Sequence, residues 1–212
     1  MAAEPRLLLV RHGESEANVA GTLQGQSHGT LTTHGRKAAT QLAVRLASLA
    51  ADERPTSVLS SDLQRAAETA RIIAGPLGLT PEPTPIAREW NVGVLDGSPA
   101  SVLHEVVLAS SLPYWEFLPS GGESLCSVRD RASTLAEMIQ DELRDPAIAP
   151  RRFRTVLVTH GDFIRMMLSM TGALRIDDAV KLALRNTSIT ELALVDNAWR
   201  IVRINDAVHL EE

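Results

Sequence analysis

The chain has 212 residues, of which 44% are hydrophobic and 22% charged, as in a folded globular protein and unlike a disordered or fibrous chain. Its net charge of −5 gives no broad basic surface, which argues against a nucleic acid as partner. The single cysteine excludes an internal disulfide, and no apolar run approaches the ~20 residues of a membrane span, so we expect a cytoplasmic protein without a membrane partner.

The first predicted elements are a short buried strand and a long helix. Residues 6–10 (RLLLV) are apolar and lie between Pro5 and Gly13, which is typical of a strand inside a parallel or mixed sheet. Residues 32–50 then repeat alanine and leucine at helical spacing. This pattern predicts an amphipathic helix.

A second strand and helix follow directly. Residues 56–59 are predicted to form the strand, and Ser61 and Gln64 have the spacing of a capping box. We therefore expect the helix SDLQRAAETARIIAG to open at this box. Gly75 and Pro76 are expected to end it.

The rest of the chain continues to alternate helices with strands. The predicted elements are a helix at 125–143, a strand at 155–159, a helix at 161–171 and closing strands at 189–195 and 199–204. Such alternation favours an α/β fold: a three-layer sandwich in which helices flank a mostly parallel central sheet.

One segment departs from this alternation. Residues 91–122 contain three prolines and the Gly121–Gly122 pair around a short apolar helix at 102–109. We interpret the segment as a small lid insertion over the sheet edge. With it, residues 1–212 are expected to form one domain.

Polar residues begin where three predicted strands end. Arg11 and His12 follow the first strand, Arg65 lies one turn into the helix after the second, and His160 and Gly161 follow the strand at 155–159. In open α/β sheets, ligands bind beyond the carboxyl ends of the strands. Arginine binds phosphate oxygens in pairs of hydrogen bonds, and a helix opening at a glycine directs free N–H groups at an anion. These ends therefore predict a phosphate site.

Two histidines in such a site indicate phosphoryl transfer to an imidazole nitrogen, which divides hydrolysis into two easier steps. The nucleophile has to be neutral, and we expect the surrounding positive charge to lower the histidine pKa. A proton donor for the leaving alkoxide is also required.

Five ordered blocks closely resemble the histidine phosphatase superfamily, in its phosphoglycerate-mutase-like branch. They are RHGESEAN at 11–18, LSSDLQRAAETA at 59–70, REWNVGVLDG at 88–97, GGES at 121–124 and VTHGDFIR at 158–165. RHG by itself is a weak signal, whereas five blocks at compatible spacings are a specific one. The resemblance extends from Leu7 to the closing RINDAVHL.

The resemblance implies a role for each matching residue. His12 is the residue phosphorylated during turnover, and Glu89 is the general acid of the first step and the base of the second. The phosphoryl group is held by Arg11, Arg65 and His160, with Gly161 opening the helix beside it, while Asn18 matches a phosphate contact and Gln24 a loop residue near the substrate. The family needs no metal, and we expect neither a metal nor another cofactor for this chain.

The inserted segment helps to separate a phosphatase from a mutase. Mutases of this family carry basic residues here, whereas no lysine or arginine lies between Glu89 and Val128. Aromatic residues take their place: Trp90, Tyr114, Trp115 and Phe117. We interpret them as an apolar lid for an alcohol and predict a phosphomonoesterase that acts on a small phosphorylated metabolite.

Several alternatives remain open from the sequence. The enzyme could be a phosphoglycerate-type mutase, or the chain could be a phosphate-binding regulator without catalysis. Glu89 could pair with Arg88, and Asn18 could cap a helix. The aromatic residues could simply pack in the core. The identity of the alcohol and the oligomeric state do not follow from the sequence.

Overall fold

The computed structural model describes residues 4–211, so residues 1–3 and 212 of the predicted domain lie outside the described residues. Within the described residues the chain forms a six-stranded sheet in the order β3-β2-β4-β1-β5-β6. The strands are β1 (Arg6–Arg11), β2 (Ser57–Ser60), β3 (Glu82–Pro83), β4 (Arg154–Thr159), β5 (Ile189–Val195) and β6 (Ala198–Asp206).

The sheet is mixed but mostly parallel. β1 lies at its centre, pairing in parallel with β4 and antiparallel with β5. β2 is parallel to both β3 and β4, and β6 closes the far edge antiparallel to β5. The predicted α/β fold is therefore confirmed, and the ends of β1, β2 and β4 meet at one edge of the sheet.

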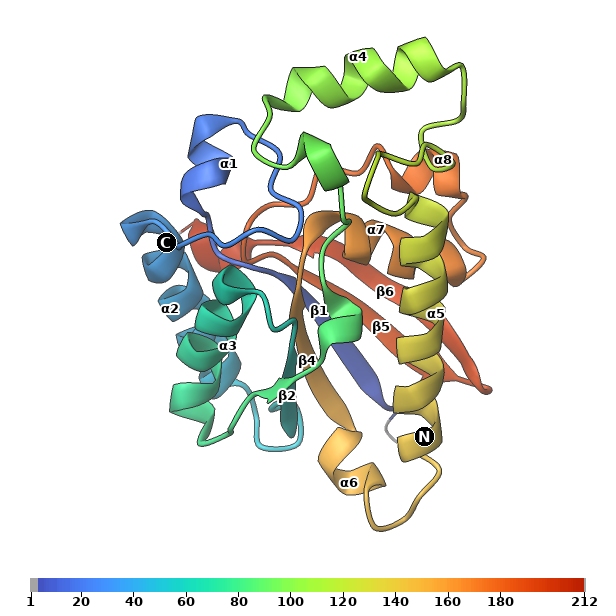
Figure 1. The fold of residues 1–212 in the computed structure, drawn as a ribbon. Coiled ribbons are helices and arrows are strands. Elements are labelled where there is room, and N and C mark those ends of the chain that lie inside the picture. The colour runs from blue at the N-terminus through green and yellow to red at the C-terminus, as the bar shows by residue number, and fades with distance from the viewer. Residues whose placement is uncertain (1–3, 212) are drawn as a thin grey trace.

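Helices cover both faces of the sheet (Figure 1). The α-helices are α1 (Glu16–Ala20), α2 (Thr33–Ser48), α3 (Gln64–Leu77), α4 (Ala100–Ser110), α5 (Leu125–Glu142), α6 (Ala149–Arg152), α7 (Gly161–Met170) and α8 (Ile176–Ala179). Short 3₁₀ turns occupy Pro85–Ala87, Gly93–Leu95 and Val208–Leu210. None of the helices in residues 4–211 combines the length and the apolar character needed to cross a lipid bilayer.

The side chains of β1 alternate between two hydrophobic clusters. Leu7 and Leu9 pack with residues of α5 and α7, while Leu8 and Val10 pack with residues of α2 and α3. All four side chains are buried. Burial on both faces explains why this strand is continuously apolar.

The boundaries of α3 differ from the prediction. The helix begins at Gln64, with Leu63 as N-cap and no side-chain cap, so the predicted capping box at Ser61 is wrong. The helix also continues through Pro76 and ends at Gly78, which has a φ of 67°. Pro76 is tolerated because it lies in the last turn, whereas the left-handed conformation that stops the helix suits glycine.

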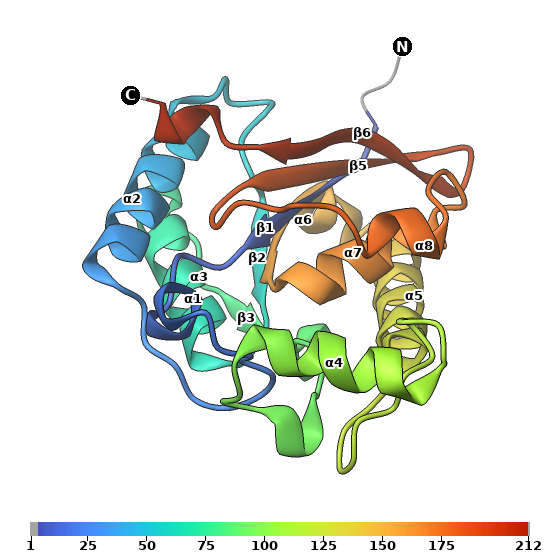
Figure 2. The same ribbon diagram turned by 90° about the horizontal axis from the view of Figure 1, so that it is seen from above.

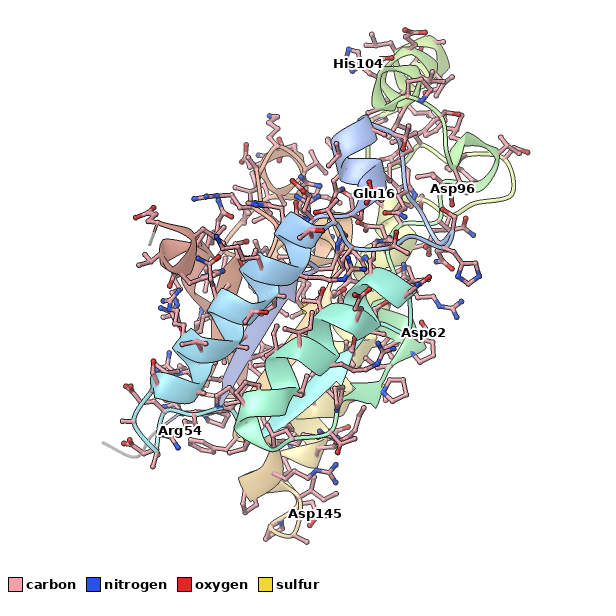
Figure 3. The ribbon with its side chains drawn as sticks, turned by 90° about the vertical axis from the view of Figure 1, so that its left-hand side faces the viewer. Glu16, Arg54, Asp62, Asp96, His104 and Asp145 are labelled. Carbon is pink, nitrogen blue, oxygen red and sulfur yellow. The ribbon has the colours of Figure 1, made fainter. Side chains whose placement is uncertain are left out.

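The inserted segment 91–122 lies over the edge of the sheet at which the parallel strands end (Figure 1). α4 crosses beyond the carboxyl ends of the strands and does not follow the lateral edges formed by β3 and β6 (Figures 1 and 2). Asp96 ties the segment to an N-terminal loop, because its carboxylate accepts hydrogen bonds from Gly25 N at 3.3 Å and Ser27 N at 3.0 Å. Figure 3 shows His104 on the outer side of α4, pointing away from the sheet.

Candidate active site

A cavity of about 280 Å³ lies at the carboxyl ends of the central strands. Most of the residues predicted from the sequence line it: Arg11, His12, Asn18, Gln24, Arg65, Glu89, Trp90, Tyr114 and Gly161. His160 lies behind this lining, fully buried, with its ring centroid 5.2 Å from that of His12. Trp115 and Phe117 pack against the main core cluster instead, so the four predicted lid aromatics divide into two cavity residues and two packing residues.

His12 keeps a lone pair on one of its ring nitrogens. Nδ1 lies 2.7 Å from Gly13 O, and because a carbonyl can only accept, Nδ1 carries the hydrogen and Nε2 keeps its lone pair. The pKa of His12 is held well below its ordinary value, chiefly by burial and then by Arg65 and Arg11. We expected the arginines to be the cause, whereas burial is the larger one. The imidazole is therefore neutral.

The guanidinium groups of Arg65 and Arg11 lie close to the His12 ring. Arg65 Nε donates to His12 Nε2 at 3.2 Å, and Arg65 Nη2 donates to Gly25 O at 2.8 Å. Burial lowers the pKa of Arg65 to about 10. Arg11 Nη1 donates to Leu184 O at 2.6 Å, while Arg11 Nε is buried without a hydrogen-bond partner among the described residues. Such a donor suits a phosphoryl oxygen.

Ser61 fixes the position of the His160 ring. Its hydroxyl oxygen accepts from Leu63 N at 3.3 Å and lies 2.8 Å from His160 Nε2. Nδ1 of His160 is buried without a hydrogen-bond partner among residues 4–211. The hydroxyl expected to cap α3 therefore orients a buried histidine whose second ring nitrogen is unpartnered.

The carboxyl of Glu89 is suited to hold a proton. Its Oε1 accepts from Trp90 N at 2.9 Å and from Asp162 N at 3.2 Å, so an amide in the first turn of α7 is directed at this carboxyl. Burial first, and then the charge of Asp162, raise the pKa of Glu89 to about 7. The alternative pairing with Arg88 does not occur, because Arg88 Nε donates to Asp62 at 2.7 Å.

A set of contacts that supports the Glu89 segment was not predicted from the sequence. Arg131 on α5 pairs with Glu123 at 2.8 Å and donates to Ile86 O at 2.6 Å, while the carbonyl of Glu123 accepts from Trp90 Nε1 at 2.5 Å. These bonds fix the segment that carries Glu89. The available signal was an arginine beside the buried stripe of α5.

Asn18 caps α1, which is one of the two roles that the sequence left open, and it also lines the cavity. Its Oδ1 accepts from Ser15 N at 3.1 Å, which caps α1, and from Asn186 Nδ2 at 3.1 Å. Because both donors meet the oxygen, the amide nitrogen of Asn18 is left for the cavity. Asn186 also donates to His12 O at 2.9 Å. Gln24 lies beside them, where its Oε1 accepts from the Ser15 hydroxyl at 2.9 Å.

Asn186 is expected to act through Asn18. In Asn186→Ala the amide of Asn18 loses one of its two orienting donors, so we expect kcat/KM for a phosphomonoester to fall about tenfold. If the effect passes through Asn18, the Asn18→Ala Asn186→Ala double variant loses little more activity than Asn18→Ala alone. Steady-state kinetics of the four proteins measure this coupling, and strictly additive losses would contradict it.

Comparison with known proteins agrees with this geometry. Residues 7–207 match the histidine phosphatase superfamily (branch 1). The chain is 36% identical to a metal-independent phosphoserine phosphatase of Arabidopsis thaliana, over 96% of this chain and 82% of that protein. It is 33% identical to a probable phosphoglycerate mutase GpmB of Proteus mirabilis, over 98% and 95% of the two chains.

A solved structure carries the same fold. The structure of a mycobacterial glucosyl-3-phosphoglycerate phosphatase superposes with a TM-score of 0.79 and 29% identity, covering 95% of this chain and 99% of that one. The relatives include both phosphatases and mutases, and the match of the family extends over nearly the whole sequence. The resemblance predicted from the five sequence blocks is confirmed, and the chain belongs to the histidine phosphatase superfamily.

Proposed function

We propose that this protein hydrolyses phosphomonoesters of small alcohols through a phosphohistidine at His12, without a metal ion. The observation that carries the proposal is the state of that imidazole. Its Nδ1 hydrogen is held by Gly13 O, and burial keeps the ring unprotonated, so Nε2 has a lone pair directed at the arginine side chains. A neutral imidazole surrounded by guanidinium groups is suited to accept a phosphoryl group.

In the first step, His12 Nε2 attacks phosphorus and the bond from phosphorus to the alcohol oxygen breaks. The electron pair of that bond stays on the alcohol oxygen, which takes the proton of the Glu89 carboxyl. A pKa of about 7 leaves this carboxyl protonated in a large share of molecules at neutral pH. Arg11 and Arg65 offset the negative charge on the phosphoryl oxygens, and we assign to His160, whose Nδ1 has no hydrogen-bond partner among residues 4–211, a further contact to the phosphoryl group.

In the second step, water attacks the phosphohistidine. The Glu89 carboxylate left by the first step takes a proton from this water while the bond between phosphorus and Nε2 breaks. The electron pair of that bond returns to Nε2, and inorganic phosphate leaves. Each residue is then in its starting protonation state, so the cycle closes without an added cofactor.

The lining of the cavity supports hydrolysis of a small ester. It includes the apolar side chains of Leu23, Val92 and Leu103, and a volume of about 280 Å³ suits a small metabolite. The phosphatases among the relatives support hydrolysis, and the relatives that carry mutase names keep the mutase as the second candidate.

The proposal is tested by phosphate release from a panel of monoesters with a chelator present. Among residues 4–211, His, Cys, Asp and Glu side chains form no group of three that could hold a metal ion. We therefore expect the rate in excess EDTA to match the rate in untreated buffer. Loss of activity in EDTA and its return with a divalent cation would contradict the metal-independent mechanism. Exchange of phosphate between paired metabolites without net release would indicate the mutase, and phosphate binding alone the regulator.

A further inference from the structure

The wall of the cavity contains an ion pair that the proposed mechanism does not use. Asp162 and Arg165, both on α7, line the cavity. Arg165 Nη1 lies 2.7 Å from Asp162 Oδ1, and Arg165 Nε donates to Leu182 O at 2.9 Å. Each side chain is 22% exposed, so the pair borders the cavity and is largely shielded from bulk solvent. The two bonds of Arg165 fix the orientation of the guanidinium group.

This pair lies next to the position of the leaving alcohol. The backbone N–H of Asp162 donates to Glu89, the carboxyl that we propose protonates the alcohol oxygen. On the other side, a Cβ placed on Gly161 would be 3.4 Å from Arg165 Nη1 and 3.8 Å from Arg11 Nε. Arg165 therefore borders the phosphoryl-binding arginine as well. A substituent close to the ester bond of a bound substrate would meet the Asp162–Arg165 pair.

The Asp162–Arg165 pair determines the net charge of the part of the cavity wall that it forms. Arg165 unpaired would make the wall cationic, and it would attract a second anionic group on the substrate. With Asp162 at 2.7 Å the two charges largely cancel, and a second anion would instead lie beside a carboxylate in a partly desolvated site. Placing like charges together in such a site is a strong means of rejecting a ligand.

We propose that Asp162 is a specificity-determining residue that selects monoesters whose alcohol carries no further negative charge. The inference rests on the proposed hydrolysis at His12 and names the class of substrate for that site. Asp162 acts by neutralising Arg165 and by repelling a second phosphate or a carboxylate. This gives a physical reason for a phosphatase, because a mutase has to hold a second anion in the same cavity.

Two esters with one carbon skeleton test the inference. Glycerol 3-phosphate carries a hydroxymethyl group where 3-phosphoglycerate carries a carboxylate. We expect the wild-type protein to prefer glycerol 3-phosphate. Asp162→Asn should raise kcat/KM for 3-phosphoglycerate relative to glycerol 3-phosphate by about tenfold or more. Because the ratio is taken within one variant, an accompanying change at Glu89 affects both substrates and cancels.

Two further variants test whether the change in the kcat/KM ratio of the two esters comes from the Asp162–Arg165 pair. The Asp162→Asn Arg165→Gln double variant should lose the relative gain in kcat/KM for 3-phosphoglycerate, because that gain comes from the unpaired guanidinium group of Arg165. Asp141→Asn breaks the exposed ion pair with Arg144, which has the same i,i+3 spacing at the carboxyl end of α5. This variant should leave the kcat/KM ratio of the two esters unchanged. An unchanged ratio in Asp162→Asn that still hydrolyses p-nitrophenyl phosphate would overturn the inference, as would a wild-type preference for 3-phosphoglycerate.

Failure of the proposed function is distinguished by a binding measurement. If the wild-type protein hydrolyses no ester, the hydrolytic proposal fails, and calorimetry then gives the Kd of both esters for the His12→Ala protein with and without Asp162→Asn. A relative gain in affinity for 3-phosphoglycerate on removal of the carboxylate supports the role of Asp162 independently of turnover. Equal affinity changes for the two esters would overturn that role.

Discussion

Replacement of His12 by alanine is expected to lower phosphate release at least about 10³-fold, because no other side chain that lines the cavity in residues 4–211 offers a comparable nucleophile to the phosphoryl group. The neighbouring His160 does not substitute for it, since its Nε2 is 2.8 Å from the Ser61 hydroxyl and it lies behind the cavity lining. Single-turnover assays with a labelled ester measure the loss. They should also show an acid-labile phosphoenzyme in the wild-type protein and none in His12→Ala.

His104→Ala is the matched control for this loss. That histidine lies on the outer side of α4, away from the cavity (Figure 3), and its removal should leave turnover unchanged. Binding of inorganic phosphate to His12→Ala shows whether the arginine side chains still form their site. Substantial turnover by a folded His12→Ala protein would rule out the phosphohistidine mechanism.

Glu89→Gln is expected to lower turnover of alkyl phosphates by about 10²- to 10⁴-fold, because glutamine neither protonates the alkoxide nor activates water. An aryl ester such as p-nitrophenyl phosphate releases a stabilised phenolate without a proton. With this ester the variant should still form the phosphohistidine and then hydrolyse it slowly. A burst of nitrophenolate, followed by a slow steady state, measures this accumulation.

The pH profile gives a second result for the same carboxyl. With a pKa of about 7, raised by burial and by Asp162, Glu89 is protonated below neutral pH and loses its proton above it. We therefore expect kcat/KM for an alkyl phosphate to fall as the pH rises through about 7. The fall should be absent from the residual activity of Glu89→Gln. Glu105→Gln, an exposed position on α4, should keep the wild-type profile, and a fall that persists in Glu89→Gln would assign it to another group.

The parts of the site that lie at strand ends could be predicted from the sequence. A continuous apolar run such as residues 6–10 has to be buried on both faces, so the polar residues after it emerge at an edge where parallel strands end together. Arg11, His12, Arg65 and His160 follow from this argument, and the sequence blocks add Glu89. Local pattern is sufficient for these residues because the sheet itself aligns them.

Other parts depend on contacts between distant segments, which local pattern does not encode. Ser61 has the spacing of a cap, but its hydroxyl interacts with His160, and α3 starts at Gln64 instead. Arg131 belongs to α5 and yet fixes the segment of Glu89. In the same way, counting basic residues in the insertion overlooked Arg165, which reaches the cavity from α7.

The central position of β1 has a consequence for folding. Its partners are β4 and β5, so the earliest of the six strands in chain order pairs with segments more than 140 residues later, as in the register of Arg6 with Arg154 and with Ala193. Such long-range pairing closes large loops and slows folding. In an incomplete nascent chain the apolar LLLV stretch of β1 lacks its partner strands β4 and β5. Such a chain contains His12 but not yet His160. Catalytic competence is therefore acquired late, together with the burial of the central strand.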